Sequence, residues 1–250
     1  MDKEALNEIY ARLNRELSTI TAGSLGNPVH WVYNPLDYAW AMHEAYIRTY
    51  APQETGGILF MGMNPGPDGM AQTGIPFGAV SFVRDYLDLD EPITPPSDVH
   101  PKKPVKGLQW HRDEPSGKRL WGFIQEIAPN PADFFSRNFL INHCPLLFLG
   151  ESGANIATAT LNHAQLQLFL ESCDRAVGEI IALLQPRALV GIGVFAAKAF
   201  SRILEHLPEL EQDIPVHQIL HPSPASPAAN RDWKGQVQKS LESSGLWPLV

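Results

Sequence analysis

The chain has 250 residues, of which 44% are hydrophobic and 18% charged, so it is large enough for one domain (residues 1–250) around a single core. Two cysteines cannot supply the four ligands of a typical iron–sulfur cluster, and no Cys/His spacing indicates zinc, so we expect no metal and no other cofactor. The formal net charge of −8 only mildly disfavours a nucleic-acid partner, since local patches determine binding.

No segment of the sequence is predicted to enter a membrane. Residues 1–4 are charged and no apolar signal core follows them, and the most apolar tract, residues 188–197, is too short to span a bilayer. We therefore expect a cytoplasmic protein.

The first predicted element is an amphipathic helix over residues 2–18, within a peripheral segment that ends at about residue 27. Leu6, Ile9, Leu13 and Leu17 lie on one face of it. The aromatic residues between 31 and 40 could stack on a ligand, but we interpret most of them as core residues, followed by a short helix that ends near residue 50.

A buried strand is predicted at residues 58–60, and it ends in an unusually constrained turn. The following Met-Asn-Pro-Gly-Pro run contains two prolines that fix φ, with Gly66 between them. Asn64 is therefore held at the carboxyl end of a strand, where open α/β sheets form their ligand crevice. Residues 77–87 are predicted to form the first crossover helix.

Residues 88–116 form a long proline-rich segment without a convincing period. A loop of this length within a compact domain is uncommon and indicates either function or disorder, and its positive charge favours function. The basic residues in and just after it are Lys102, Lys103, Lys106, Arg112, Lys118 and Arg119.

The rest of the chain alternates helices and strands. Helices are predicted at residues 120–127, 166–184, 195–207 and from 230, and strands at 139–141, 188–192 and 215–220. Cys173 falls on the apolar stripe of the second of these helices and is predicted to be a small core residue. The pattern predicts an α/β fold, with three α/β/α layers around a central four-stranded parallel sheet.

Three predicted strands end in a polar residue close to proline: Asn64, Asn142 and His221. An amide cannot act as a strong base near neutral pH, but Asn64 can orient a water molecule. His221 can donate a hydrogen bond to a developing anion or transfer a proton. This set suits a reaction in which the leaving group departs as a stabilised anion and water attacks late. Acyl transfer is disfavoured, since the serine between Gly150 and Gly153 lacks the spacing of a hydrolase elbow.

At these motifs the sequence resembles the single-strand-selective monofunctional (SMUG-type) uracil-DNA glycosylases. The matching runs are GMNPGP with GMAQTGIPFG, then Asn142 with Cys144-Pro145-Leu146, then HPSP from His221. The likeness extends from about residue 28 to the end of the chain. It implies the uracil-DNA glycosylase fold and a monofunctional hydrolase that releases uracil and 5-substituted uracils from single- and double-stranded DNA, leaving an abasic site.

The resemblance also implies roles for individual residues. Asn64 would position the attacking water and His221 would stabilise the uracil anion through O2. Asn142 would read the base edge, Phe77 would stack on the flipped base, and Met63 with Gly66 would leave room near C5. The segment that follows His221 would enter the duplex as a wedge, namely Pro222, Ser223, Pro224, Ala225, Ser226 and Pro227.

Four positions depart from the animal relatives. Asp68 stands where they carry Phe, His143 where they carry Leu, and Ala225-Ser226 where they carry Arg-Asn. Alanine fills the space of a flipped base poorly and adds no phosphate contact, which predicts either weaker binding to duplex DNA or the use of other wedge residues. The sequence leaves open the preferred lesion, the use of xanthine, the balance between single and double strands, and the oligomeric state, for which we expect a monomer.

Two other interpretations compete with this one. A non-catalytic nucleic-acid-binding protein could keep the pocket, although the intact set of strand-end residues argues against it. A nucleotide or cofactor binder is suggested by Gly191-Ile-Gly193, but the third glycine of a dinucleotide fingerprint is missing, as is an acidic ribose ligand at the expected distance.

Overall fold

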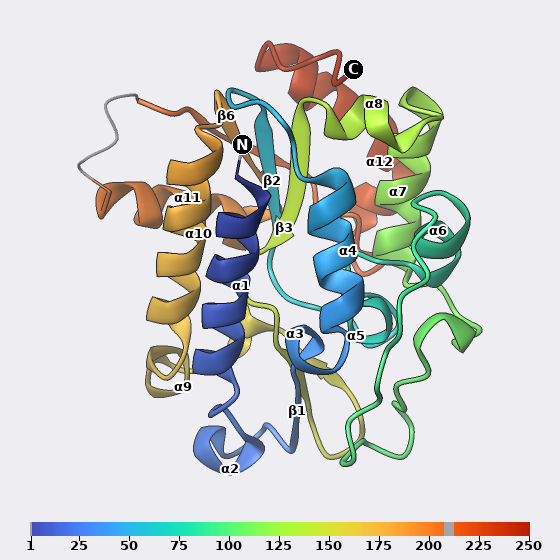
Figure 1. The fold of residues 1–250 in the computed structure, drawn as a ribbon, viewed down its shortest axis with the longest axis vertical. Helices are drawn as coiled ribbons and strands as arrows, with labels where there is room; N and C mark the ends of the chain where they lie inside the picture. Colours follow the sequence, from blue (N-terminus) through green and yellow to red (C-terminus); the bar gives the residue numbers. More distant parts are fainter. Residues whose placement is uncertain (1, 208–212) are drawn as a thin grey trace.

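The computed structural model describes residues 2–207 and 213–250, and its centre is a parallel sheet between two layers of helices (Figure 1). The strand order is β3-β2-β6-β7. This confirms the predicted α/β architecture with four parallel strands. The strands are β2 (Ile58–Gly62), β3 (Asn138–Asn142), β6 (Ala188–Ile192) and β7 (Val216–Ile219).

Strands β2, β3 and β6 consist of buried residues throughout, as expected for a parallel sheet covered on both faces. The register pairs Gly62 of β2 with Asn142 of β3. Both strands therefore end at the same level, and the chain segments that leave them begin side by side. The sheet thus sets the distance between the two polar motifs that follow β2 and β3.

Helices cover both faces of the sheet (Figure 1). One layer contains α1 and α10, which pack against each other, and α11, which packs on β6 and β7. The other contains α7, α8 and α12, whose apolar residues meet Phe60 and Leu140 of the sheet. The long helices are α1 (Lys3–Leu17), α4 (Trp40–Tyr50), α7 (Pro115–Ile127), α10 (Leu170–Leu184), α11 (Val194–Glu205) and α12 (Pro227–Ser243).

Short helices fill the connections, and local sequence explains where they begin. Proline occupies the first turn of α3, α7, α8 and α12, where its missing N–H costs no hydrogen bond. Asn34 and Asn130 cap α3 and α8 through their side-chain oxygens. The short helices are α2 (Ala22–Leu25), α3 (Pro35–Tyr38), α5 (Met70–Thr73), α6 (Val80–Asp85), α8 (Pro131–Phe135) and α9 (His163–Gln167), with 3₁₀ turns at Gly107–Gln109 and Thr158–Thr160.

A second, antiparallel sheet was not predicted. It consists of β1 (Trp31–Tyr33), β4 (Leu147–Leu149) and β5 (Asn155–Ile156), in the order β1-β4-β5. Strands of two or three residues are too short to show an alternating pattern. The aromatic segment around β1 is mainly a packing element, as predicted: Tyr33 and Tyr38 are buried, and the Tyr33 hydroxyl donates to the Lys103 carbonyl at 2.8 Å.

Three predicted helices differ from the structure. A crossover helix over residues 77–87 is wrong, because Phe77 has φ 54° and only Val80–Asp85 is helical. The connection from β2 to β3 instead uses α5, α6, α7 and α8. The predicted helix 166–184 is interrupted at Phe169, which has ψ −14° and φ −139°. The last helix begins at Pro227 rather than residue 230, because Ser226 caps it.

Other expectations concern the core and the membrane. Cys173 is fully buried on α10, which confirms its assignment to the core, and Cys144 is also a buried free thiol. Within residues 2–207 and 213–250, no helix has the length and apolar character needed to cross a bilayer.

Candidate active site

A cavity of about 210 Å³ opens at the carboxyl ends of β2, β3 and β7. It brings together all six residues that the sequence proposed for catalysis and base binding. The cavity is also lined by residues that the sequence analysis did not single out for it. The lining residues are Met63, Asn64, Pro65, Gly66, Phe77, Glu114, Ser116, Asn142, Asn155, His221 and Ser223.

The Phe77 ring lies directly against the end of β2. A Cβ atom on Gly62 would collide with this ring and would lie 2.6 Å from the Asn142 side-chain oxygen, so only glycine fits there. Phe77 has a positive φ of 54°, a conformation that costs free energy and that its surroundings must hold in place. Gly117 in the first turn of α7 allows the backbone of Phe77 to pack closely against that helix, since a side chain at residue 117 would strike the Phe77 carbonyl.

His221 follows β7 and presents one defined tautomer to the cavity. The backbone N–H of Ser223 donates to Nδ1 of His221 at 3.1 Å, so Nδ1 is the unprotonated nitrogen and Nε2 bears the hydrogen. Burial lowers the pKa of His221 below its ordinary value, because a charged ring would lose its hydration. The ring is therefore a neutral donor through Nε2–H at neutral pH.

Asn64 is oriented by two backbone groups. Its Oδ1 accepts a hydrogen bond from the N–H of Thr158 at 3.3 Å, and its Nδ2 donates to the Pro65 carbonyl at 3.2 Å. Thr158 lies in the segment after β5, so the second sheet supplies part of the support for this side chain. A carbonyl oxygen has two lone pairs, which leaves Oδ1 with capacity for one further donor such as water.

Asn142 ends β3 and is buried at the base of the cavity. Its Nδ2 contacts the Met70 sulfur at 3.1 Å, a weak acceptor that occupies one of the two amide hydrogens. The other amide hydrogen and Oδ1 remain as an adjacent donor and acceptor. This pair is complementary to a cyclic imide edge, in which a carbonyl stands next to an N–H.

Glu114 is the main cavity residue that sequence reasoning missed. It immediately precedes α7 and lies in the proline-rich segment, where nothing local distinguishes it from a surface carboxylate. Burial and the neighbouring Asp68 carboxylate raise the pKa of Glu114 to about 7. The sequence contained only an indirect indication of this site. Gly66 and Gly69 have no side chain at the positions where the Glu114 carboxyl group packs against them.

The loop from residue 222 to 227 is fixed to the body of the protein. Arg119 of α7 donates to the Pro222 carbonyl at 3.2 Å and to Oδ1 of Asn230 at 2.7 Å. Asn230 in turn donates to the Pro224 carbonyl at 2.7 Å. Ala225 is exposed at the tip of this loop, where its N–H donates to the Ser223 hydroxyl.

The basic residues of the long loop are partly organised by packing. Lys106 lies over the Trp110 ring with its Nζ 5.9 Å from the ring centre, and the indole N–H of Trp110 donates to Asp68 at 3.1 Å. Lys102, Lys106 and Arg112 are exposed. Asp68, which stands where the animal relatives carry Phe, is therefore held by a hydrogen bond from Trp110.

The His143 departure is likewise accommodated by a polar network behind the site. His143 is fully buried, and its Nε2 is paired with Asp174 of α10 at 2.6 Å. Arg202 of α11 binds the same carboxylate through two nitrogens, at 2.7 and 2.8 Å. Burial opposes ionisation of Asp174, but these partners outweigh it and hold its pKa below the ordinary value.

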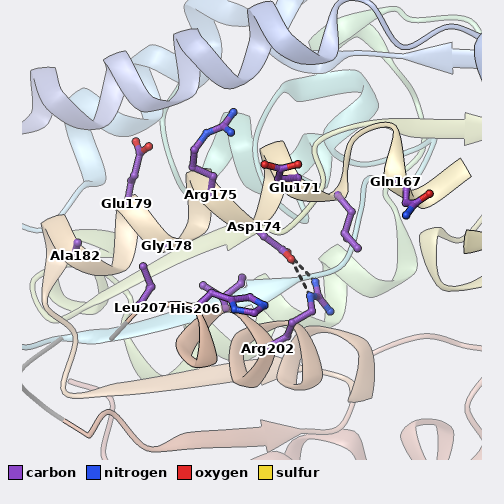
Figure 2. Close-up of a pocket in the computed structure, with 12 residues that line it drawn as sticks. Gln167, Glu171, Asp174, Arg175, Gly178, Glu179, Ala182, Arg202, His206 and Leu207 are labelled. Carbon is purple, nitrogen blue, oxygen red and sulfur yellow. Dashed lines mark hydrogen bonds and ion pairs between the residues drawn. The ribbon is translucent and has the colours of Figure 1, made fainter. Parts of the chain in front are cut away.

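A larger hollow of about 700 Å³ lies between α10 and α11 (Figure 2). Ion pairs join Asp174 with Arg202, Arg175 with Glu16, and Glu179 with Arg12, and Glu171 also lines the hollow. None of the predicted site residues lines it. We therefore assign the chemistry to the smaller cavity at the strand ends, which contains all six of them.

The glycines that suggested a nucleotide-binding loop have packing roles instead. A side chain on Gly191 would strike the backbone of Ala197 in α11, and one on Gly193 would lie 3.2 Å from Cβ of His221. They allow α11 to approach β6 and the His221 segment to approach the sheet. No group of three or more His, Cys, Asp or Glu residues able to hold a metal occurs within the described part of the chain.

Comparison with known proteins gives a consistent result. Residues 49–242 match the family model described as the uracil DNA glycosylase superfamily. The single-strand selective monofunctional uracil DNA glycosylase of Mus musculus is 43% identical over 250 residues, covering 99% of this chain and 86% of that protein. The one from Bos taurus is 45% identical over 240 residues, covering 96% and 85%.

Solved structures agree on the fold. The crystal structure of wild-type Pedobacter heparinus SMUG2 superposes with a TM-score of 0.68 at 17% identity, covering 96% of this chain and 97% of that one. At this identity the likeness supports the fold alone, whereas the sequence relatives cover nearly the whole chain. The protein therefore belongs to the uracil DNA glycosylase superfamily, within the group of single-strand selective monofunctional uracil-DNA glycosylases.

Proposed function

We propose that this protein is a monofunctional DNA glycosylase of base-excision repair, which hydrolyses the N-glycosidic bond of uracil and 5-substituted uracils in DNA and leaves an abasic site. The observation that carries the proposal is the fixed tautomer of His221. A neutral imidazole that offers Nε2–H to a cavity of base-binding size is suited to stabilise an anionic leaving group.

The leaving group determines the role of His221. When the glycosidic bond breaks, its electron pair remains on the base, and the negative charge spreads from N1 to O2. A neutral donor stabilises that anion as it forms, without giving it a proton beforehand. Because the Ser223 N–H already occupies Nδ1, the ring does not need to reorient during the reaction.

Asn64 has the complementary role of orienting water. Its Oδ1 has one lone pair engaged by the Thr158 N–H and one available for a water hydrogen. A water held there would attack the sugar C1′ as the base departs. The second proton of that water can pass to solvent or to the departing base, so no strong base is needed in the site.

Asn142 and Phe77 would select the base. The free amide hydrogen and Oδ1 of Asn142 match O4 and N3–H of uracil, whereas cytosine presents an amino group and an unprotonated N3. The Phe77 ring would stack on the flipped base. Met63 and Gly66 would lie toward C5, which is the position at which substituted uracils differ.

The DNA strand would lie across the mouth of this cavity. Exposed Lys102, Lys106 and Arg112 provide phosphate contacts on an otherwise acidic protein. The loop of residues 222–227 would act as the wedge that occupies the space of the flipped base. We expect the protein to work as a monomer in the cytoplasm. Sedimentation of the purified protein would test whether it is a monomer.

The test is single-turnover release of uracil from a single-stranded oligonucleotide. His221→Leu should lower the rate by about 10²–10³-fold, the usual cost of deleting one preorganised donor to an anion. His163→Leu is the matched control, because it removes an exposed histidine on α9. A rate for His221→Leu within about threefold of the wild-type rate would show that this assignment is wrong.

The same assay separates the glycosylase from the competing non-catalytic DNA-binding protein. A binder would retain uracil-containing DNA without releasing free base. A glycosylase that uses a lysine nucleophile would form a covalent adduct that borohydride traps. The described cavity lining contains no lysine, so the proposal expects free uracil and an intact abasic strand.

A further inference from the structure

His143 is a buried polar residue that the reaction outlined above does not use. It directly follows Asn142 at the end of β3, and its side chain is fully buried. Successive side chains of an extended segment point to opposite sides, so the His143 ring lies among residues of α10 and α11 while the Asn142 amide faces the cavity. The residues that line the cavity do not include His143.

Two helices hold the His143 ring from behind. Arg202 of α11 binds both oxygens of Asp174 and helps to keep this carboxylate of α10 ionised (Figure 2). An ionised carboxylate can only accept, so Nε2 of His143 bears the hydrogen and donates it to Asp174 at 2.6 Å. Phe195 in the first turn of α11 meets the His143 ring edge to face, with the ring centres 5.6 Å apart.

The backbone of the same segment is bound to the turn after β2. The N–H of His143 donates to the Gly62 carbonyl, and the N–H of Cys144 donates to the Met63 carbonyl, each at 2.9 Å. These two bonds continue the pairing of β2 and β3 beyond both strands, as far as the turn that contains Asn64. The segment after β3 is therefore held by this turn on one side and by the helix layer on the other.

Asn142 depends on this support because its own side chain is weakly held. Among the described residues, the amide has one hydrogen-bond partner, the Met70 sulfur, which is a weak acceptor. The direction of the Asn142 side chain is consequently set mainly by its backbone. Hydrogen bonds weaken steeply with distance and angle, so a small displacement of that backbone would weaken both bonds to a base edge.

Helix α11 also borders the other residue proposed to contact the leaving group. Gly193 immediately precedes α11, and a Cβ atom there would lie 3.2 Å from Cβ of His221. The helix packs on β7 as well, the strand that ends just before His221. Since the His143 ring contacts α11, the same helix supports Asn142 on one side of the cavity and His221 on the other.

Stability alone does not account for a histidine at this position. Nδ1 of His143 is buried and has no hydrogen-bond partner within the described part of the chain. A buried nitrogen without a partner is unfavourable, and an apolar side chain of similar size would avoid this cost. The contribution of His143 is therefore to be sought in where it holds its neighbours.

We infer that His143 is a positioning residue, which joins the segment after β3 to α10 and α11 and thereby holds the Asn142 amide at the edge of the flipped base. This inference rests on the proposed role of Asn142 in the glycosylase. His143 acts on the reaction only through Asn142, because its own ring does not line the cavity. Its loss should slow base release and leave the contacts with the DNA backbone unchanged.

The experiment measures single-turnover release of uracil from a single-stranded oligonucleotide over a range of enzyme concentrations. His143→Leu should lower the maximal rate about 5–10-fold, which corresponds to the loss of one hydrogen bond to the base. The enzyme concentration that gives half the maximal rate should change by less than about threefold, since backbone binding precedes base flipping. His206→Leu is the matched control, because His206 is exposed at the end of α11 and should behave as the wild type.

Two further variants separate positioning from a general weakening of the fold. Adding His143→Leu to Asn142→Ala should lower the rate by less than about twofold beyond Asn142→Ala alone, because the residue through which His143 acts is already gone. His143→Gln should restore the rate to within about threefold of the wild type. Nε2 of glutamine is separated from Cβ by the same number of bonds as Nε2 of histidine, so it can donate to Asp174.

Distinct results overturn the inference and the function on which it rests. A His143→Leu rate within about twofold of the wild-type rate, a loss that multiplies with that of Asn142→Ala, or failure of His143→Leu to melt cooperatively would each refute the positioning role and leave the glycosylase standing. If Asn142→Ala released no measurable base, a His143→Gln rate as low as that of His143→Leu would refute it instead. Wild-type protein that releases no uracil would refute the proposed function and the inference together.

Discussion

Replacing Glu114 with Gln should stabilise the protein, and increasingly so as pH rises. The folded-state pKa of Glu114 is raised from 4.5 to about 7, whereas in the unfolded chain it should return to its ordinary value. Between these values the folded state binds more protons than the unfolded state. The free energy of unfolding of the wild type is therefore unaffected by this group below about pH 4.5, and it decreases as pH rises through about 7.

The size of the effect follows from the shift. One pKa unit corresponds to about 1.4 kcal/mol, so the full shift would amount to about 3 kcal/mol above pH 8. Glu114 keeps partial exposure through the cavity, where water screens its charge, and we expect about 1–2 kcal/mol of this to be measured. For a domain of this size, that is roughly 2–8 °C in melting temperature.

The assay is thermal unfolding of the wild type and Glu114→Gln at intervals from pH 5 to 8.5. Glu126→Gln is the control, because it makes the same chemical change at an exposed position of α7. The difference in melting temperature between Glu114→Gln and the wild type should be small at pH 5 and grow toward pH 8.5. The control should show no such growth. Equal differences at pH 5 and 8.5 would mean that Glu114 ionises at its ordinary pKa, and the reasoning from burial would fail.

Three further predictions concern the site and its approach to DNA. Gly62→Ala should reduce uracil release by at least 10²-fold, because the added methyl group displaces the Phe77 ring. Single-turnover kinetics will check this on a variant that still melts cooperatively, and near-wild-type rates would contradict it. Ala225→Arg should raise activity on duplex DNA more than on single strands, and it should steepen the salt dependence of binding. Ala182→Arg, at an exposed position on α10, is the control for added charge. An equal change in activity on both substrates would show that residue 225 is not in the wedge. Uracil release should persist in excess EDTA, since an oriented water and a neutral donor suffice for the chemistry, and activity restored only by a divalent ion would disprove this.

The sequence predicted the strand ends well because each is marked locally. An apolar run that stops at a polar residue close to proline can be recognised within ten residues, and Asn64, Asn142 and His221 all have this form. Their meeting at one cavity follows from the parallel topology, which the alternation of helices and strands also predicts.

The features that escaped prediction depend on contacts between distant segments. The second sheet is made of strands too short for a period. Its β5 lines the cavity through Asn155, and Thr158 just after it contacts Asn64. Phe77 was assigned to a helix because a positive φ at a non-glycine residue leaves no local mark. Glu114 became a site residue only when the fold brought it onto Gly66.

The hydrogen bonds of Arg119 have a consequence for how the protein meets a duplex. They join α7, the Pro222 carbonyl and Asn230 of α12 before any nucleic acid is present, so the loop of residues 222–227 has already lost much of its conformational freedom. A segment ordered in advance presents the same shape at every encounter, so in the proposed wedge role its insertion at a base pair would not wait for a folding step. Discrimination between a stable and a weakened base pair would then depend on how readily the DNA opens. The protein would sample many sites quickly and stay bound at only a few of them.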